Sequence, residues 1–348
     1  MSRINKYENN FYSRITDILK SAKNKVLQTV NTTMVETYFE IGKLIVEEEQ
    51  NGKERAEYGK QILKELSNKL TKEFGKGFSE DNLGNMRKFY LTYQFPISET
   101  LSRKSDLTAI QPQNSFKLSW SHYLKLMRIE DKNERQFYEI ECAKNNWSLK
   151  ELQRQYDSAL YTRLALSRDK EGVLQLSEQG LVLEKPQDAI KDPYVLEFIG
   201  LPEKAEYSES DLEQKLIDKL ENFLLELGTG FTFVARQKRI TFDEKNFRID
   251  LVFYNRILKS FVLIDLKIGE LKHQDIGQMQ MYVNYYDREI RLLDENRTIG
   301  LILCQDKSEA VVQYTLPENN EQIFASKYQT VLPSKEKLKE LIENKDEE

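Results

Sequence analysis

Two apolar segments in the last third of the chain carry charged residues where a strand would normally bury a hydrophobic side chain. The segment RIDLVFYN (248–255) contains Asp250, and SFVLIDLKIG (260–269) contains Asp265 and Lys267. Aspartate is disfavoured inside strands, and a buried carboxylate without a partner costs several kcal/mol. Charged groups kept at such positions point to a chemical role.

Strand geometry would bring these three groups together. Residues i and i+2 of a strand project to the same side, so Asp265 and Lys267 share one face. If the two segments pair as a hairpin around NRILKS (255–260), Asp250 lies beside Asp265. The sequence therefore predicts two carboxylates and one ammonium at a single point.

Two adjacent carboxylates need more positive charge than one lysine supplies, because both cannot ionise cheaply. A divalent cation bound by Asp250 and Asp265 would neutralise them, and oxygen ligands favour Mg²⁺ (or Mn²⁺) over zinc. Such an ion lowers the pKa of a bound water and clamps phosphate oxygens. Lys267 would position that water or stabilise charge growing on the phosphate. This pattern predicts hydrolysis of a phosphodiester.

A structural explanation of the same residues stands beside the catalytic one. Asp265 and Lys267 can form a salt bridge on a half-exposed edge strand, with Asp250 as a turn residue. A D-x-K sequence alone is common by chance. The addition of Asp250, of the flanking apolar runs and of an upstream amphipathic helix favours catalysis.

Composition limits the class of protein. The 348 residues suggest about two domains, and 39% hydrophobic with 31% charged residues suits a soluble chain with real cores. The net charge of −5 disfavours a whole-surface nucleic-acid binder, although 52 Lys and Arg residues suffice for local basic patches. No G-x-x-x-x-G-K-[ST] sequence is present, so an ATP-driven step would need a partner.

Compartment follows from similar observations. The two cysteines lie far apart in sequence, which favours a reducing compartment over a disulfide scaffold. The sequence contains no apolar run of the ~20 residues that would predict a membrane span. Its first residues lack the apolar centre of a signal peptide. We expect a cytoplasmic protein that does not bind membranes.

Hydrophobic periodicity divides the chain into segments. Residues 1–170 have helical spacing, and 171–207 form a linker with three of the seven prolines. Residues 208–330 follow the order α-β-β-β-α-β, a compact α/β unit, and 331–348 form a charged tail. The amphipathic segment SDLEQKLIDKLENFLLELG (210–228) is expected to be one helix.

A helix, a glycine turn and a second helix follow one another between residues 56 and 95 of the N-terminal domain. Glycines 75 and 77 end the first helix, and Ser79 caps the second. This outline fits a DNA-reading helix-turn-helix or an ordinary helical hairpin in a bundle. In the first case, the residues expected to contact DNA are Asn82, Asn85, Arg87 and Lys88.

The sequence RIDLVF…VLIDLK resembles the PD-(D/E)xK nuclease superfamily. That resemblance implies a restriction-endonuclease-like α/β core in which a helix acid, a second-strand acid and a third-strand D/E-x-K meet. Carried onto this chain, the helix acid is Glu213, and Ile249 stands where the name-giving proline would. Glu213 can equally be an exposed helix residue paired with a neighbouring lysine.

The helix after the third strand extends the resemblance. GQMQMYVNYY (277–286) contains Gln278 and Tyr282, which match the Q-x-x-x-Y element of the RecB-like branch. The resemblance implies that Gln278 lies at the active site and that this helix, with Tyr282, faces DNA. A surface glutamine and a core tyrosine are the alternatives.

A closer resemblance covers residues 10 to about 330. YFEIGKLIVEEEQNGKERAEYGKQILKELSNKLTKEFGKGFSEDNLGNMRKFY, LSWSHYLKLMRI and IGQMQMYVNYYD are similar to the YhcG-like bacterial proteins. This family implies an α+β two-domain protein with a helical N-terminal domain and a C-terminal PD-(D/E)xK core. The implied role is DNA processing in recombination, repair or defence against foreign DNA.

Taken together, these observations predict a Mg²⁺-dependent deoxyribonuclease. Asp250, Asp265 and the Leu266 carbonyl are expected to bind the metal, Lys267 to assist the attacking water, and Glu213 and Gln278 to complete the site. Phosphate contacts are expected from the end of the first strand, where a solvated strand edge is an equal alternative. These residues are Arg236, Lys238 and Arg239.

Other functions remain open at this stage. The fold can serve a non-catalytic DNA-binding or assembly protein, with the helical domain docking a protein partner, or a nuclease that acts on RNA. A homo-oligomer is compatible with the sequence. Substrate structure, sequence preference and endonucleolytic or exonucleolytic cutting do not follow from it.

Overall fold

The structure, a computed structural model, describes residues 2–51, 56–94, 116–166, 170–191, 193–202, 207–242 and 245–332. The chain divides into two compact units, Met1–Arg135 and Gln136–Glu348. This division lies before the boundary expected at residue 170. Most of the charged tail expected at 331–348 lies outside the described residues.

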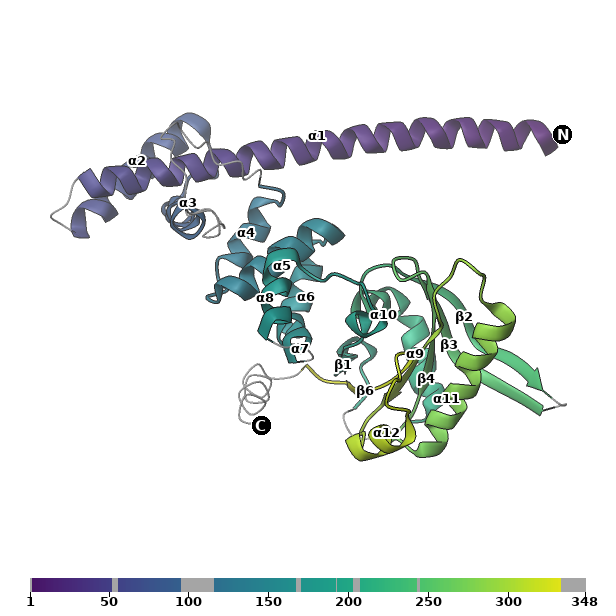
Figure 1. The fold of residues 1–348 in the computed structure, drawn as a ribbon. Coiled ribbons are helices and arrows are strands. Elements are labelled where there is room, and N and C mark those ends of the chain that lie inside the picture. The colour runs from purple at the N-terminus through teal and green to yellow at the C-terminus, as the bar shows by residue number, and fades with distance from the viewer. Residues whose placement is uncertain are drawn as a thin grey trace, which may run out of the picture. The chain divides into compact units, whose positions relative to one another are not determined.

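The first unit is helical (Figure 1). The Ser79 hydroxyl accepts a hydrogen bond from the Asn82 backbone N–H, which confirms the expected helix start, and Leu83, Met86 and Phe89 form the buried face of that helix. A side chain at Gly42 would overlap the Met86 carbonyl, so glycine allows the close approach of two helices. The elements are α1 (Ser2–Asn51), α2 (Ala56–Phe74), α3 (Glu80–Tyr93) and α4 (Trp120–Leu126).

Short helices connect this region to the sheet. The second of them begins with a capping box, in which Ser148 and Glu151 each accept a hydrogen bond from the other's backbone N–H. The elements are α5 (Lys132–Asn145), α6 (Leu149–Asp157), α7 (Leu160–Leu166), α8 (Lys170–Gln179) and the 3₁₀ turns η1 (Pro186–Ala189) and η2 (Glu197–Ile199).

The second unit contains a mixed sheet with the strand order β1-β6-β5-β4-β3-β2. The pairs β2–β3 and β3–β4 are antiparallel, and the pairs β4–β5, β5–β6 and β6–β1 are parallel. Their bounds are β1 (Tyr194–Val195), β2 (Phe231–Phe242), β3 (Lys245–Asn255), β4 (Ser260–Leu266), β5 (Ile299–Cys304) and β6 (Ile323–Gln329).

Helices cover both faces of this sheet (Figure 1). Leu216 of α9 (Glu209–Asp218) and Phe223 of α10 (Leu220–Leu227) pack with Ile264 and Leu301 in one core. On the other face, α11 (His273–Tyr285) packs over Leu263 and Ile302 in a second core. The π-helical turn η3 (Tyr286–Ile290) extends α11, and α12 (Glu309–Thr315) precedes β6.

Two sequence expectations need correction here. The segment 210–228 is not one helix, because Lys219, with φ −118° and ψ 33°, separates α9 from α10. The expected order of elements also omitted two strands, because β6 joins the sheet beside β5 and β1 pairs with β6. The expected α-β-β-β-α-β core is present within this larger sheet.

Candidate active site

The predicted hairpin between β3 and β4 is confirmed, and it brings the two aspartates together. The antiparallel register pairs Leu251 with Ile264, which places Asp250 and Asp265 opposite each other one residue further on. Asp250 Oδ2 accepts a hydrogen bond from the Leu266 backbone N–H at 2.8 Å. The Asp250 side chain thus bonds to β4 at the point where the regular pairing of β3 with β4 ends.

Asp265 is a buried carboxylate with one close cation. Asp265 is 2% exposed, and Lys267 Nζ lies 2.9 Å from Asp265 Oδ2. Burial and the neighbouring charge of Asp250 raise the pKa of Asp265 to about 7, against the opposing effect of Lys267. Burial alone would lower the pKa of Lys267, but the carboxylate of Asp265 outweighs it and raises that pKa.

Glu213 reaches the same group through a glutamine that the sequence did not single out. Glu213 is buried and pairs with Arg236, and it also accepts a hydrogen bond from Gln237 Nε2. The same Nε2 donates to Asp250 Oδ1 at 3.0 Å. The helix acid and the strand acid are therefore joined by one amide.

The backbone of Gln237 explains how two consecutive residues of β2 reach the same acid. Successive strand residues normally project to opposite faces. Gln237 has φ +47°, a left-handed conformation that interrupts this alternation. Arg236 and Gln237 consequently both contact Glu213. A non-glycine residue in this conformation costs of order 1–3 kcal/mol, and such strain concentrates at functional sites. Backbone conformation of this kind cannot be read from a glutamine in a strand.

A second acid on α9 was also missed. Glu209 Oε1 accepts from the Ile268 N–H at 3.3 Å, and its Oε2 lies 3.9 Å from Lys267 Nζ. Glu209 and Glu213 are four residues apart and so lie on one side of the helix. That spacing was the available signal, since two acids one turn apart can both approach the end of a strand.

Gln278 and Tyr282 lie beside this group but bond to each other. Gln278 Nε2 donates to the Tyr282 hydroxyl, which in turn donates to the Arg248 carbonyl at 2.8 Å. Tyr282 is fully buried. Direct DNA contact by Tyr282 does not fit this position, because its ring packs under β3. The tyrosine fixes α11 against the strand that carries Asp250.

The basic residues expected on the first strand separate in the structure. Arg236 is held by Glu213 and by Gln214 Oε1, the latter at 2.8 Å. Lys238 and Arg239 are both exposed. Arg236 therefore belongs to the cluster of acidic residues around Asp250 and Asp265. A phosphate contact by Arg236 would compete with its ion pair to Glu213.

On α3, Asn82 has a structural partner on either side. Its amide donates to the Gly77 carbonyl at 2.6 Å, and its Oδ1 accepts from Trp120 Nε1 at 3.0 Å. These bonds join the turn before α3 to the start of α4. Asn82 is therefore committed within its own unit.

The remaining α3 candidates differ in exposure. Arg87 Nε donates to Glu49 Oε2 at 2.6 Å, which joins α3 to α1. Asn85 is half-buried, and Lys88 is exposed. A DNA-reading role for this helix stays a prediction.

The donor atoms fit a hard divalent cation. Asp250 and Asp265 supply carboxylate oxygens, the set that Mg²⁺ or Mn²⁺ prefers. Asp265 Oδ2 is buried and, among the described residues, lacks a well-directed hydrogen bond despite the nearby Lys267. In the same part of the chain, no three Asp, Glu, His or Cys side chains group as a metal cluster.

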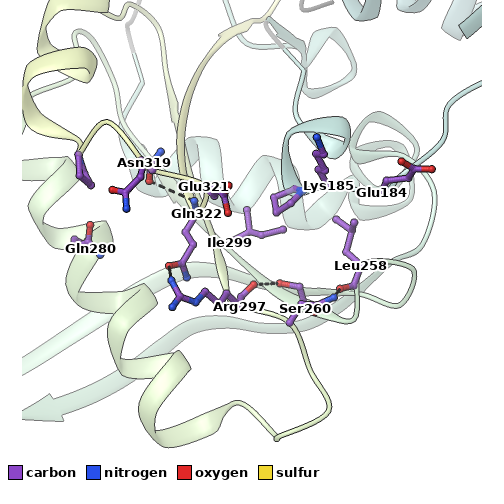
Figure 2. A pocket seen from close by; sticks show the side chains of 14 residues that line it. Glu184, Lys185, Leu258, Ser260, Gln280, Arg297, Ile299, Asn319, Glu321 and Gln322 are labelled. Atoms are coloured by element: carbon purple, nitrogen blue, oxygen red, sulfur yellow. Dashed lines mark hydrogen bonds between the residues drawn. The ribbon is translucent and has the colours of Figure 1, made fainter. Parts of the chain in front are cut away.

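A separate cavity of about 430 Å³ lies at the opposite ends of the parallel strands (Figure 2). Its lining includes Ser260 at the start of β4 and Ile299 at the start of β5, whereas Asp265 lies near the end of β4. Arg297 and Gln322 line it as well. This cavity is distinct from the site formed by Asp250, Asp265 and Lys267.

Within the described residues, none of the helices combines the length and the apolar character that crossing a membrane requires.

Parts of this chain match parts of solved structures at low similarity. One is a repair endonuclease from Pyrococcus abyssi, 17% identical, with a TM-score of 0.26 over 38% of this chain and 50% of that chain. Another is titled as an EndoMS complex with dsDNA, 16% identical, with a TM-score of 0.28 over 38% of this chain and 49% of the other. Each match spans about half of the solved chain.

Sequence relatives are much closer. An Escherichia coli (strain K12) protein named "Putative nuclease YhcG" is 40% identical over 343 residues, which cover 93% of this chain and 90% of that protein. The DUF1016 N-terminal domain matches residues 14–163, and the YhcG PDDEXK nuclease domain matches residues 187–343. The carboxylates, Lys267 and α11 all lie in the second match. The chain therefore belongs to the YhcG family of PDDEXK nuclease-domain proteins.

Proposed function

We propose that this protein is a metal-dependent nuclease that hydrolyses phosphodiester bonds in DNA. The observation that carries the proposal is the group formed by Asp250, Asp265 and Lys267 at the end of β4, where a buried carboxylate oxygen lacks a well-directed hydrogen bond. Membership of a nuclease-domain family supports the reaction class. DNA as substrate is the step that needs experiment.

Asp250, Asp265 and the Leu266 carbonyl would hold Mg²⁺ or Mn²⁺. When bound, the ion would acidify a water and neutralise charge on the phosphate. Lys267 adds a positive charge beside Asp265 and can orient the attacking water or stabilise the charge that develops on phosphate oxygens. The buried setting of these groups strengthens each electrostatic contact.

The surrounding residues position the carboxylates. Asp250 bonds to the Leu266 N–H with one oxygen and to Gln237 with the other, so its carboxylate has a fixed orientation. The same Gln237 Nε2 also donates a hydrogen bond to Glu213. These contacts support a positioning role for Glu213, and the bonds of Gln278 and Tyr282 support a role in fixing α11 beside the carboxylates.

Cleavage of a substrate panel tests the proposal. Linear, nicked, branched and single-stranded DNA, with matched RNA strands, would be incubated with Mg²⁺, Mn²⁺ or EDTA. The wild type would run beside Asp265→Asn and beside Asp294→Asn, an exposed acid of the same unit. We expect cutting that needs metal, is lost in Asp265→Asn and persists in Asp294→Asn.

Other outcomes separate the alternatives. Cutting that survives in Asp265→Asn would contradict the proposed site. Faster cleavage of RNA than of DNA would reassign the substrate. DNA binding without any cutting by the wild type would favour a binding or assembly protein on a nuclease fold. The branched and nicked substrates would show which DNA structure is preferred, and with it a role in recombination, repair or defence.

A further inference from the structure

The hairpin formed by β2 and β3 carries a row of polar side chains that begins at the proposed active site. Along β3, Asn246 and Arg248 alternate with the more buried Phe247 and Ile249, so the two polar residues share the side that faces away from the α11 core. Asp250 follows at the point where this alternation is interrupted, since Ile249 and Val252 both belong to the α11 core. The hydrogen bond between Gln237 and Asp250 marks the inner end of this row. The row runs outward along the hairpin from Asp250.

The next position outward places two arginines face to face. Arg239 of β2 is paired directly with Arg248 of β3, and both are exposed. Like charges directly opposite each other destabilise a strand pair. Arg239 Nε donates to Asn246 Oδ1 at 2.9 Å, and within the described residues neither guanidinium has an ion-pair partner. Two opposed arginines repel each other in the free hairpin, and an anion bound by both would remove that repulsion.

The strand that carries Arg248 is held in place. The Tyr282 hydroxyl donates to the Arg248 carbonyl at 2.8 Å, which ties the backbone at this position to α11. Along a strand, residues two apart are separated by about 7 Å. Arg248 is therefore fixed about one such step from Asp250, close enough to meet the same extended chain of phosphates.

The other basic residues of the hairpin are placed differently. Lys238 pairs with Ile249, and Lys245 lines a groove with Phe247 and Met281, so both lysines lie on the α11 side. That groove also carries Glu289. The hairpin thus offers two exposed arginines on the side away from α11 and two lysines on the α11 side.

We infer that Arg239 and Arg248 together bind the phosphates that adjoin the cleaved bond and hold the cut strand along β3. This inference rests on the proposed function and specifies how the substrate is held. Guanidinium groups suit the task because their planar donors can bind phosphate oxygens in pairs. The two arginines would bind the substrate beside the reacting bond, and they do not contact Asp250 or Asp265.

Salt-dependent DNA binding by the full chain tests the inference. The affinity for one duplex and one single strand would be measured in EDTA, so that no cutting occurs, across a range of salt concentrations. The variants are Arg239→Gln with Arg248→Gln and, as a matched control, Arg256→Gln with Lys259→Gln, which removes the same charge from exposed residues in the turn between β3 and β4. A third variant, Arg239→Lys with Arg248→Lys, keeps the charge.

Each lost phosphate contact should reduce the slope of log affinity against log salt by about 1. We expect the arginine-to-glutamine pair to reduce the slope by about 2, the control pair to change it by much less, and the lysine replacements to restore most of it. Equal reductions in both glutamine pairs would overturn the inference, as would an unchanged slope in the arginine pair. Thermal unfolding of each variant checks that the fold is kept.

Failure of the inference is distinguishable from failure of the proposed function. If the wild type binds and cuts DNA while the arginine pair behaves like the wild type, only the inference is wrong. If the wild type neither binds nor cuts DNA in the panel above, the proposed function itself fails and the inference with it.

Discussion

Two buried acids in the second unit, Glu226 and Asp265, have opposite environments. Glu226 is 0% exposed, and its Oε1 accepts from Arg163 Nη1 at 2.5 Å and from the Val195 N–H at 3.1 Å, while Oε2 accepts from Arg154 Nη1 at 3.3 Å. Asp265 has a single close cation and an oxygen without a well-directed hydrogen bond among the described residues.

The pKa values of the two acids record this difference. Burial alone would raise the pKa of Glu226, but Arg163, Lys191 and Arg154 outweigh it and hold the pKa at about 2. Burial and Asp250 raise the pKa of Asp265 to about 7. A buried acid surrounded by cations stabilises a fold, whereas a buried acid beside a second acid is left ready for a further cation.

The largest expected effect separates activity from stability at Asp265. Asp265→Asn removes a metal ligand and should reduce cleavage by at least about 10³-fold, comparable to the loss of a major electrostatic contribution. The same change removes a poorly compensated buried charge, so the free energy of unfolding should stay equal or rise. Cleavage rates and urea unfolding of the same preparation check both parts. A large loss of stability would mean that the carboxylate is structural.

At Glu226 the opposite outcome is expected. Glu226→Gln leaves the buried Arg163 and Lys191 without their acid and should lower the free energy of unfolding by about 3–5 kcal/mol. Glu221→Gln, at an exposed position of the same helix, is the matched control. Urea unfolding measures both. A Glu226 variant as stable as the control would remove the distinction between the two acids.

The pH dependence of stability sharpens the contrast. The folded-state pKa of Glu226, about 2, is below its ordinary value of 4.5. Its contribution is therefore fully present above pH 4.5 and is lost as pH falls towards 2, by about 3 kcal/mol in all. The stability difference between wild type and Glu226→Gln should shrink over that interval. A difference independent of pH from 5 to 2 would contradict the assigned pKa.

The smallest expected effect concerns the left-handed backbone at Gln237. Gln237→Ala and Gln237→Gly both remove the amide that joins Glu213 to Asp250. Glycine tolerates φ +47° without strain, so the glycine variant should be more stable than the alanine variant by about 1 kcal/mol. Thermal unfolding compares them. Both should cut DNA more slowly than the wild type and to a similar degree.

Sequence reasoning worked where a residue type conflicted with its surroundings. Asp250, Asp265 and Lys267 interrupt apolar runs, and period-two alternation together with the hairpin was enough to bring them together. The cap at Ser79 was predictable for a similar reason, because a short polar side chain before an amphipathic run has one favourable hydrogen-bonding pattern.

It failed where the decisive fact was a backbone angle or a long-range contact. Gln237 is an ordinary strand residue until its φ is known, and the break at Lys219 leaves no mark in the periodicity of the segment. Tyr282 matched a motif, yet its buried ring fixes α11 to β3. Arg248 has an ordinary strand context, and its importance depends on which residue lies opposite.

The buried ion pair between Arg163 and Glu226 also bears on how such chains are inherited and recombined. The N-terminal family segment ends at residue 163, and the nuclease segment begins at residue 187. The guanidinium of Arg163 is therefore supplied by one segment to the acid of the other. Exchanging either segment for an unrelated one would leave a buried charge without its counterpart, so a chimera of this kind would have to replace Arg163 and Glu226 together.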